Sequence, residues 1–261
     1  DDGDGAPDED GRSGYWLTGE DGGVFSHGSA QFYGSAAEIA LAAPISGMAA
    51  KPDARGYWLA GKDGGVFAFG DGGFYGSMNG AGLSGEIVDI ASTPSGRGYW
   101  LVGADGGVFS FGDAGYFGSL GGQPLAAPVV AIIPTPNGGG YWLIAEDGGV
   151  FTFGNAPFHG SMGAKPLRSP VTGGWATPTG EGYWLNGGDA GIFTFGDAPF
   201  YGSMGGQEIR APASGMTAPG FDGYWIGAED GGVFTFGSIP FHGSQSLAAL
   251  RGRIVEIVNA A

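Results

Sequence analysis

The chain has 261 residues, of which 42% are hydrophobic, and it contains no cysteine. Disulfides, thiolate catalysis and cysteine-ligated metal sites are therefore excluded, while the length is ample for one large hydrophobic core. The formal net charge of −16 argues against nucleic acid and anionic lipid as partners, because like charges repel.

Residues 1–13 are the first predicted element, an acidic and flexible tail. The first ten, DDGDGAPDED, hold six of the 26 acidic residues, and charge runs of this kind are usually solvated. The Asp-x-Asp-Gly spacing resembles part of a calcium loop but lacks the remaining ligands, including the bidentate Glu. A disordered linker is therefore favoured over a calcium site.

The rest of the chain consists of six copies of one unit, of which GYWLIAEDGGVFTFGNAPFHGS at 140–161 is an example. The copies begin at Gly14, Gly56, Gly98, Gly140, Gly182 and Gly223. Their starts lie 42 residues apart, or 41 for the last, and a period this regular indicates a repeat architecture. Residues 14–261 are predicted to form a single domain.

Each unit carries four short β signals. In the unit that begins at Pro128 these are Val129–Ile133, Tyr141–Ala145, Val150–Phe153 and Phe158–Gly160. Asp147-Gly148 predicts a two-residue hairpin turn in which both residues take positive φ. Four antiparallel strands per repeat are typical of a β-propeller blade, and runs such as YWLIA suit strands covered on both faces. The predicted fold class is an all-β, six-bladed β-propeller.

The chain ends predict how the ring closes. Five units are preceded by an innermost-strand signal such as Ile87–Ile90, but the unit at Gly14 is not. Arg253–Val258 (RIVEIV) matches that signal at the C-terminus. One blade is therefore predicted to combine both chain ends, because a closed ring leaves no open sheet edge, whereas an open solenoid needs atypical caps.

The units resemble the GYWL…DGGVFSFGDAxFYGS repeats of secreted and cell-surface proteins of actinobacteria. The resemblance covers about residues 14–261 and is clearest at 105–114, DGGVFSFGDA. It implies a propeller-like extracellular module, secreted or held at the cell surface, and it brings no catalytic motif. His27, Ser29, Ser238 and the segment 186–191 (NGGDAG) depart from the pattern, which argues against six equal sites.

Three rings of repeated side chains are interpreted as structural. The Trp and Tyr of each GYW motif are expected to pack between blades, since they bury large apolar areas. The Asp of each Asp-Gly turn is expected to bond its own turn, although six carboxylates on one face could attract cations. The rings are Trp16, Trp58, Trp100, Trp142, Trp184 and Trp225; Tyr15, Tyr57, Tyr99, Tyr141, Tyr183 and Tyr224; and Asp21, Asp63, Asp105, Asp147, Asp189 and Asp230.

The position before Gly-Ser in the predicted fourth strand is the candidate ligand-binding ring. Its residues pair a flat body with a polar tip, which suits a half-exposed site, and packing at the rim is the alternative interpretation. The ring comprises Tyr33, Tyr75, Phe117, His159, Tyr201 and His242.

Two features break the repeat near the predicted channel. Trp175 stands where other units have Ala, Ile, Thr or Val, and it is expected to fill a local gap or line the channel mouth. Asp89 and Glu256 hold equivalent innermost positions where other units have Gly or Ala. Such an acid pair could bind a cation or carry out hydrolysis.

These observations favour a non-catalytic module that recognises a cell-surface glycan or protein. The alternatives are a structural spacer and a hydrolase with an acidic site in the channel. No metal site, cofactor or catalytic residue is predicted, because the chain lacks nucleophile-elbow, phosphate-loop and HExxH motifs. The protein is predicted to be a monomer that neither inserts into membranes nor binds nucleic acid.

Overall fold

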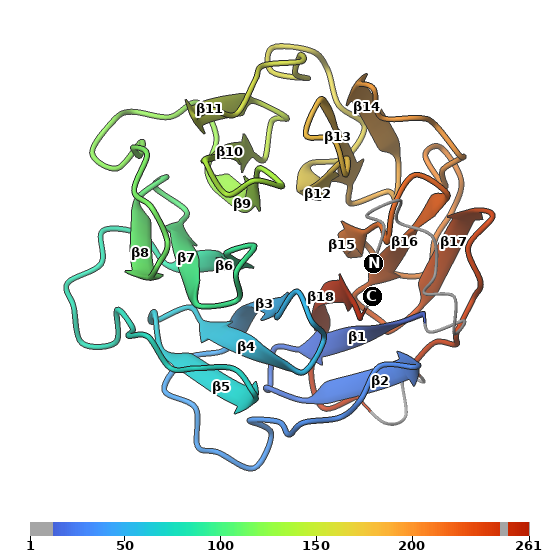
Figure 1. Cartoon of the computed structure of the whole chain (residues 1–261). Coiled ribbons are helices and arrows are strands. Elements are labelled where there is room, and N and C mark those ends of the chain that lie inside the picture. The colour runs from blue at the N-terminus through green and yellow to red at the C-terminus, as the bar shows by residue number, and fades with distance from the viewer. Residues whose placement is uncertain (1–12, 246–249, 261) are drawn as a thin grey trace.

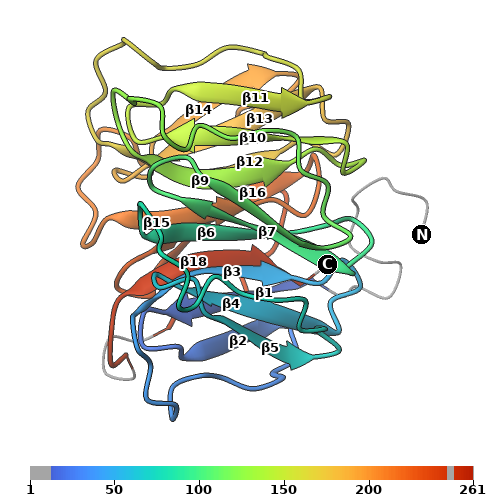
Figure 2. The ribbon, with the colours of Figure 1, turned by 90° about the vertical axis from the view of Figure 1, so that its left-hand side faces the viewer.

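The computed structural model describes residues 13–245 and 250–260, which form eighteen strands in six antiparallel sheets. The sheets surround a common centre like blades, and their strands run roughly along the ring axis (Figures 1 and 2). The predicted all-β ring of six repeats is confirmed. Residues 1–12 of the predicted tail lie outside the described residues.

Each blade has an inner, a middle and an outer strand. The inner strands are β3 (Ile45–Ala50), β6 (Ile87–Ser92), β9 (Val129–Pro134), β12 (Val171–Ala176), β15 (Ala213–Thr217) and β18 (Ile254–Asn259). The middle strands are β1 (Gly14–Gly19), β4 (Gly56–Gly61), β7 (Gly98–Gly103), β10 (Gly140–Ala145), β13 (Gly182–Gly187) and β16 (Gly223–Ala228). The outer strands are β2 (Val24–Gly28), β5 (Val66–Gly70), β8 (Val108–Gly112), β11 (Val150–Gly154), β14 (Ile192–Gly196) and β17 (Val233–Gly237).

The core lies between the blades. Every residue of every middle strand is buried, which explains why GYWL runs do not alternate with polar residues. The Trp of each middle strand packs on the middle-strand Tyr of the next blade, with ring centroids 5.1–6.0 Å apart. All twelve of these side chains are fully buried, so the structural interpretation of both rings is confirmed.

The predicted fourth strand is wrong, because each sheet has three strands. Phe158–Gly160 forms no ladder. Buried side chains bind its backbone instead: Trp142 Nε1 donates to the carbonyl of Pro157, and the Tyr183 hydroxyl donates to the carbonyl of Gly160. Since these bonds satisfy the backbone polar groups without a partner strand, the segment stays extended and unpaired.

The hairpin turn also differs from the prediction. Gly148 N donates to the carbonyl of Ala145, and Ala145 N donates to the carbonyl of Gly149. These bonds enclose three loop residues, and only Gly148 has positive φ, at 76°. The turn is therefore a three-residue loop with a left-handed glycine at its end.

Closure by the C-terminal strand is confirmed. β18 pairs antiparallel with β1, with Val258 opposite Trp16, and the red and blue strands lie side by side in Figure 1. β18 also contacts the inner strands β15 and β3 on its two sides. The Trp225 ring packs on Tyr15 at 5.1 Å, so the last and first repeats meet as the others do.

Candidate functional site

The six predicted ligand-binding residues lie at the outer edge of the blades and are half-buried. Each ring packs against the middle-strand Tyr of the following blade, with centroids 5.6–5.8 Å apart. We call them the anchor ring: Tyr33, Tyr75, Phe117, His159, Tyr201 and His242. These side chains therefore pack against the inter-blade core. Contact between them and a ligand stays a prediction.

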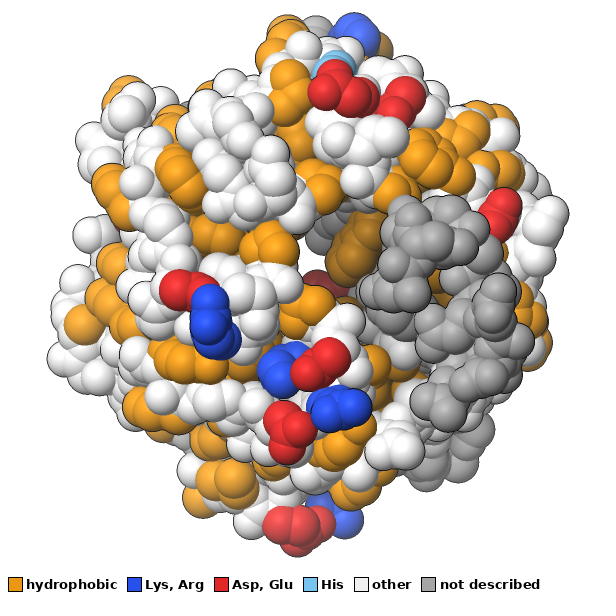
Figure 3. Space-filling view, in the orientation of Figure 1, with side chains coloured by type: hydrophobic (Ala, Val, Ile, Leu, Met, Phe, Trp, Pro, Cys, Tyr) orange, Lys and Arg blue, Asp and Glu red, His pale blue; other side chains and the backbone are white. Residues whose placement is uncertain are grey.

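The residue immediately before each anchor residue is the one that faces solvent. These six aromatic side chains are 57–63% exposed, in a protein that fully buries the Trp and Tyr of every middle strand. We call them the exposed ring: Phe32, Phe74, Tyr116, Phe158, Phe200 and Phe241. Figure 3 shows apolar side chains spaced around the periphery of one face of the molecule.

Hydrogen bonds hold the backbone on both sides of each exposed aromatic residue. On its N-terminal side, the middle-strand Trp donates to the carbonyl of the preceding residue at 2.7–2.9 Å. On its C-terminal side, the Tyr hydroxyl of the next blade donates to the Gly carbonyl at 2.5–2.6 Å. The same hydroxyl accepts an anchor-residue N–H in five of the six blades. The exposed side chains therefore project from a preorganised backbone.

The exposed ring lies next to the residues that the sequence indicated as candidate ligand contacts. Both positions are aromatic in all six repeats, as in Phe74-Tyr75 and Tyr116-Phe117. Adjacent residues of an extended chain point to opposite sides, so one of the two had to face outward. The polar tip indicated the anchor position, and in the structure the Tyr33 hydroxyl donates to the carbonyl of Ala54 at 3.0 Å.

The six Asp residues of the Asp-Gly turns serve turn geometry. In each, Oδ1 accepts the N–H of the glycine two residues on, at 2.9–3.1 Å, which is the expected self-bonded turn. Across residues 13–245 and 250–260, no group of three or more His, Cys, Asp or Glu is placed to hold a metal.

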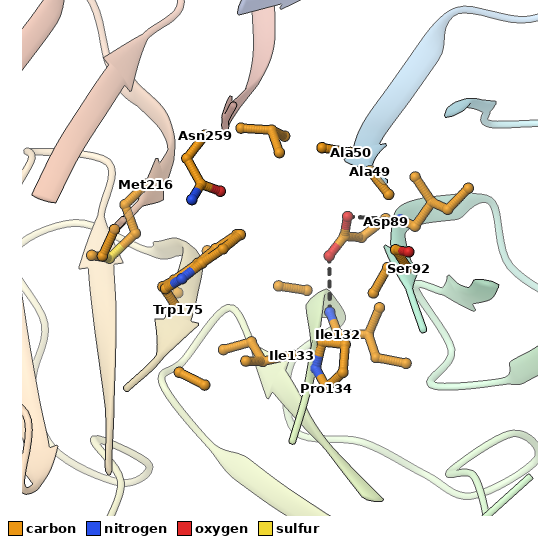
Figure 4. A pocket seen from close by; sticks show the side chains of 18 of the residues that line it. Ala49, Ala50, Asp89, Ser92, Ile132, Ile133, Pro134, Trp175, Met216 and Asn259 are labelled. Atoms are coloured by element: carbon orange, nitrogen blue, oxygen red, sulfur yellow. Dashed lines mark hydrogen bonds between the residues drawn. The ribbon is translucent and has the colours of Figure 1, made fainter. Parts of the chain in front are cut away.

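A pocket of about 420 Å³ occupies the centre of the ring, and a hollow is visible there in Figure 3. Trp175, Asp89 and Glu256 all line it, so the structure brings together the residues that break the repeat. Figure 4 shows Trp175 and Asp89 on opposite sides of the cavity. Gap filling was the favoured interpretation of Trp175 and the channel mouth the alternative. The structure shows Trp175 lining the pocket and also packing against the buried core cluster that contains Trp184 and Tyr224.

Glycines make room for the two carboxylates. A Cβ on Gly215 would lie 2.5 Å from Glu256 Oε1, and a Cβ on Gly47 would lie 3.1 Å from Asp89 Oδ1. Asp89 accepts N–H bonds from Ile132 at 2.9 Å and Ile90 at 2.7 Å. The carboxylate of Asp89 thus ties β6 to β9.

Both carboxyls titrate above their ordinary range. Burial raises the pKa of Asp89 to about 7, against the opposing effect of its two amide bonds. Burial, and then the negative charge of Asp89, raise the pKa of Glu256 well above its usual value. The pair consequently retains protons near neutral pH.

Comparisons with known proteins bear on the fold alone. No family model and no curated protein matches the chain. Among solved structures, a chain from a crystal structure of a nidogen/laminin complex superposes with a TM-score of 0.68 at 11% sequence identity. The match covers 95% of this chain and 98% of that one.

The fold is propeller-like. The similarity extends over nearly the whole of both chains, so the two chains share a fold. In the described part of the chain, no helix has the length and apolar character needed to cross a bilayer.

Proposed function

We propose that this protein is a non-catalytic, extracellular binding module that holds a repetitive glycan through the exposed ring. The observation that carries the proposal is the solvent exposure of one aromatic side chain at the same position of all six repeats. The fold gains little from these rings, because an exposed side chain contributes little to stability. Their presentation on a fixed backbone suits binding, since preorganisation lowers the entropy cost of association.

A glycan fits this arrangement better than a single protein surface does. The aromatic rings are separated, one per blade, whereas protein interfaces concentrate their apolar anchors in one central cluster. A flat aromatic ring matches the C–H face of a sugar ring, and its dispersion contacts need no charge. The net charge of −16 disfavours acidic polymers, so the proposed ligand is neutral or cationic.

The structural neighbour supports a binding role in general terms. It comes from the crystal structure of a nidogen/laminin complex, so a similar fold occurs in an assembly of two proteins. A protein partner is therefore the second candidate, and the same experiment distinguishes the two.

The test uses a glycan array followed by pull-down on the insoluble form of the best polysaccharide. The key variant replaces all six exposed-ring residues by Ser. We expect it to lose binding by roughly 100-fold or more, because multivalent contacts are lost together, while its melting temperature changes little. The matched control is Ile39→Ser, which removes an apolar side chain that is 48% exposed but lies outside the ring, and it should bind as wild type does.

Three results would contradict the proposal. The six-residue variant could keep full affinity, or wild type could bind no glycan and instead capture one defined protein. Alternatively, Tyr75→Ala and Tyr201→Ala in the anchor ring could abolish binding at unchanged melting temperature, which would move the site to the residues first predicted.

A further inference from the structure

The central pocket is a second feature that the exposed ring does not use. Five prolines that follow the inner strands line it: Pro52, Pro94, Pro136, Pro178 and Pro219. Proline has a fixed φ and no N–H donor, so this part of the wall is stiff and offers few donors. A concave, preformed cavity with a small number of polar groups is the usual form of a small-molecule site.

Two acidic side chains in the pocket lining are hydrogen-bond acceptors when ionised. Asp89 and Glu256 supply carboxylates. Asp89 accepts two N–H bonds and Glu256 accepts one. Lone pairs therefore remain on both carboxylates for donors brought by a ligand.

The apolar side of the pocket supplies a flat surface. Trp175 and Met216 stand together on one side in Figure 4. Trp175 is the one tryptophan that is not fully buried. An indole face attracts cations as well as apolar groups, so its place opposite a carboxylate favours a positively charged ligand with an apolar body.

We propose that the central pocket binds a small organic cation, an ammonium or guanidinium group on a flat apolar body. Its N–H donors bond Asp89 and Glu256, and its body stacks on Trp175. Binding displaces the proton that the acid pair holds, and this proton passes to solvent. The site is separate from the exposed ring, so its test does not depend on the proposed glycan binding.

The charged groups around the acid pair are few. Lys51, at the end of β3, is the basic residue in the pocket lining, and its Nζ pairs with Asp53 at 2.8 Å. No other Lys, Arg or His lines the pocket. Among the described residues, the acid pair therefore has no cationic partner within the pocket, and a ligand cation can take that role.

The experiment titrates the full chain with phenethylamine and with its uncharged analogue 2-phenylethanol. Calorimetry in two buffers of different ionisation enthalpy reports proton release, and tryptophan fluorescence reports stacking. We expect the amine to bind at least about tenfold more tightly than the alcohol, which corresponds to about 1.4 kcal/mol. Affinity should fall by up to about tenfold for each pH unit below 7, because protons compete for the carboxylates.

Variants of three pocket residues test which side chains hold the amine. Glu256→Gln and Asp89→Asn should each weaken amine binding and reduce proton release, and Trp175→Phe should remove most of the fluorescence change. Glu38→Gln, at an exposed acid outside the pocket, is the control and should bind normally. Equal affinity for amine and alcohol, binding unaffected by both acid variants, or no binding at millimolar amine would overturn the proposal. A melting temperature that rises with Ca²⁺ and not with the amine would also overturn it.

Discussion

Asp89 and Glu256 interrupt a layer of the channel wall that glycine and alanine otherwise occupy. Two carboxyls in one buried layer repel each other when ionised and lose hydration. Three features let the fold accommodate the two carboxyls. Both retain protons near neutral pH, and backbone amides of β9 and of their own strands donate to them. Gly47 and Gly215 leave space for their side chains. Such an arrangement costs stability near neutral pH, which is typical of residues retained for a site.

The acid pair predicts a pH dependence of stability. The pKa of Asp89 rises from 3.8 to about 7 on folding, and that of Glu256 also rises. The native state therefore binds more protons than the unfolded state between about pH 4 and 7. As the pH rises through that window, the free energy of unfolding falls by a few kcal/mol. Urea unfolding at several pH values should show this fall, and Asp89→Asn with Glu256→Gln should remove it. An unchanged profile in the double variant would contradict the assignment.

The opposite pH dependence of stability is predicted for His27 and His242. Both rings pack on Tyr15, where the first and last repeats meet. Burial lowers the pKa of each, so the unfolded state takes up protons first as pH falls below about 6.5, and stability is lost there. His27→Phe installs the residue that the other five blades carry, such as Phe69, and should reduce this loss. Phe69→His should add a similar acid sensitivity to the second blade. Melting temperatures between pH 7 and 5 test both, and identical pH profiles for all three proteins would contradict the idea.

At the scale of the element, the rim segment shows which contacts replace a fourth strand. The Tyr99 hydroxyl donates to the carbonyl of Gly76 and accepts the N–H of Tyr75. Tyr99→Phe keeps the packing but leaves both backbone groups without this partner, and it should cost about 1–3 kcal/mol. Hydrogen exchange at the amide of Tyr75 should accelerate, whereas the amides of the β7 ladder should be less affected. Unchanged protection at Tyr75 would mean that the hydroxyl does not hold the segment.

The elements differ in how far sequence could predict them. In the repeat whose strands were predicted in full, the three strands at 129–133, 141–145 and 150–153 agree with β9, β10 and β11 within one residue, because inter-blade burial fixes both their length and their composition. The prediction of a fourth strand was wrong because an extended Phe-His-Gly segment has the same sequence signal in both cases, whether a neighbouring strand or buried side chains bind its backbone. The exposed ring was not predicted, because a Phe in an extended segment gives no sign of which side of the chain faces solvent. The pocket acids and Trp175 were found because each breaks an otherwise regular position.

At the scale of the whole molecule, closure by β18 should decide whether the ring is stable. Ile254, Ile257 and Val258 are buried, while Val255 is half-buried. Three buried aliphatic side chains contribute about 1.5–3 kcal/mol each, which is a large part of the roughly 5–15 kcal/mol that stabilises a typical domain. Deleting residues 251–261 should therefore cause aggregation or a much lower melting temperature.

A permuted chain provides the matching control. Ala260 N donates to the carbonyl of Gly14, as Lys51 N does to that of Gly56. Residues 251–260 can therefore precede Ser13 through a three-residue turn that copies Pro52–Ala54. The permuted protein should fold and melt near wild type. A truncated protein that keeps the wild-type melting temperature, or a permuted one that fails to fold, would contradict closure through β18.

Graded removal of the exposed ring tests the proposed function most directly. Variants with one, three and six of its residues replaced by Ser are compared on the same immobilised glycan, after circular dichroism has shown that each melts near wild type. Affinity should fall stepwise, and the loss should reach roughly 100-fold or more at six replacements. Affinity that is independent of the number of exposed aromatic residues, or lost entirely at a single position, would contradict a ring of six equivalent contacts.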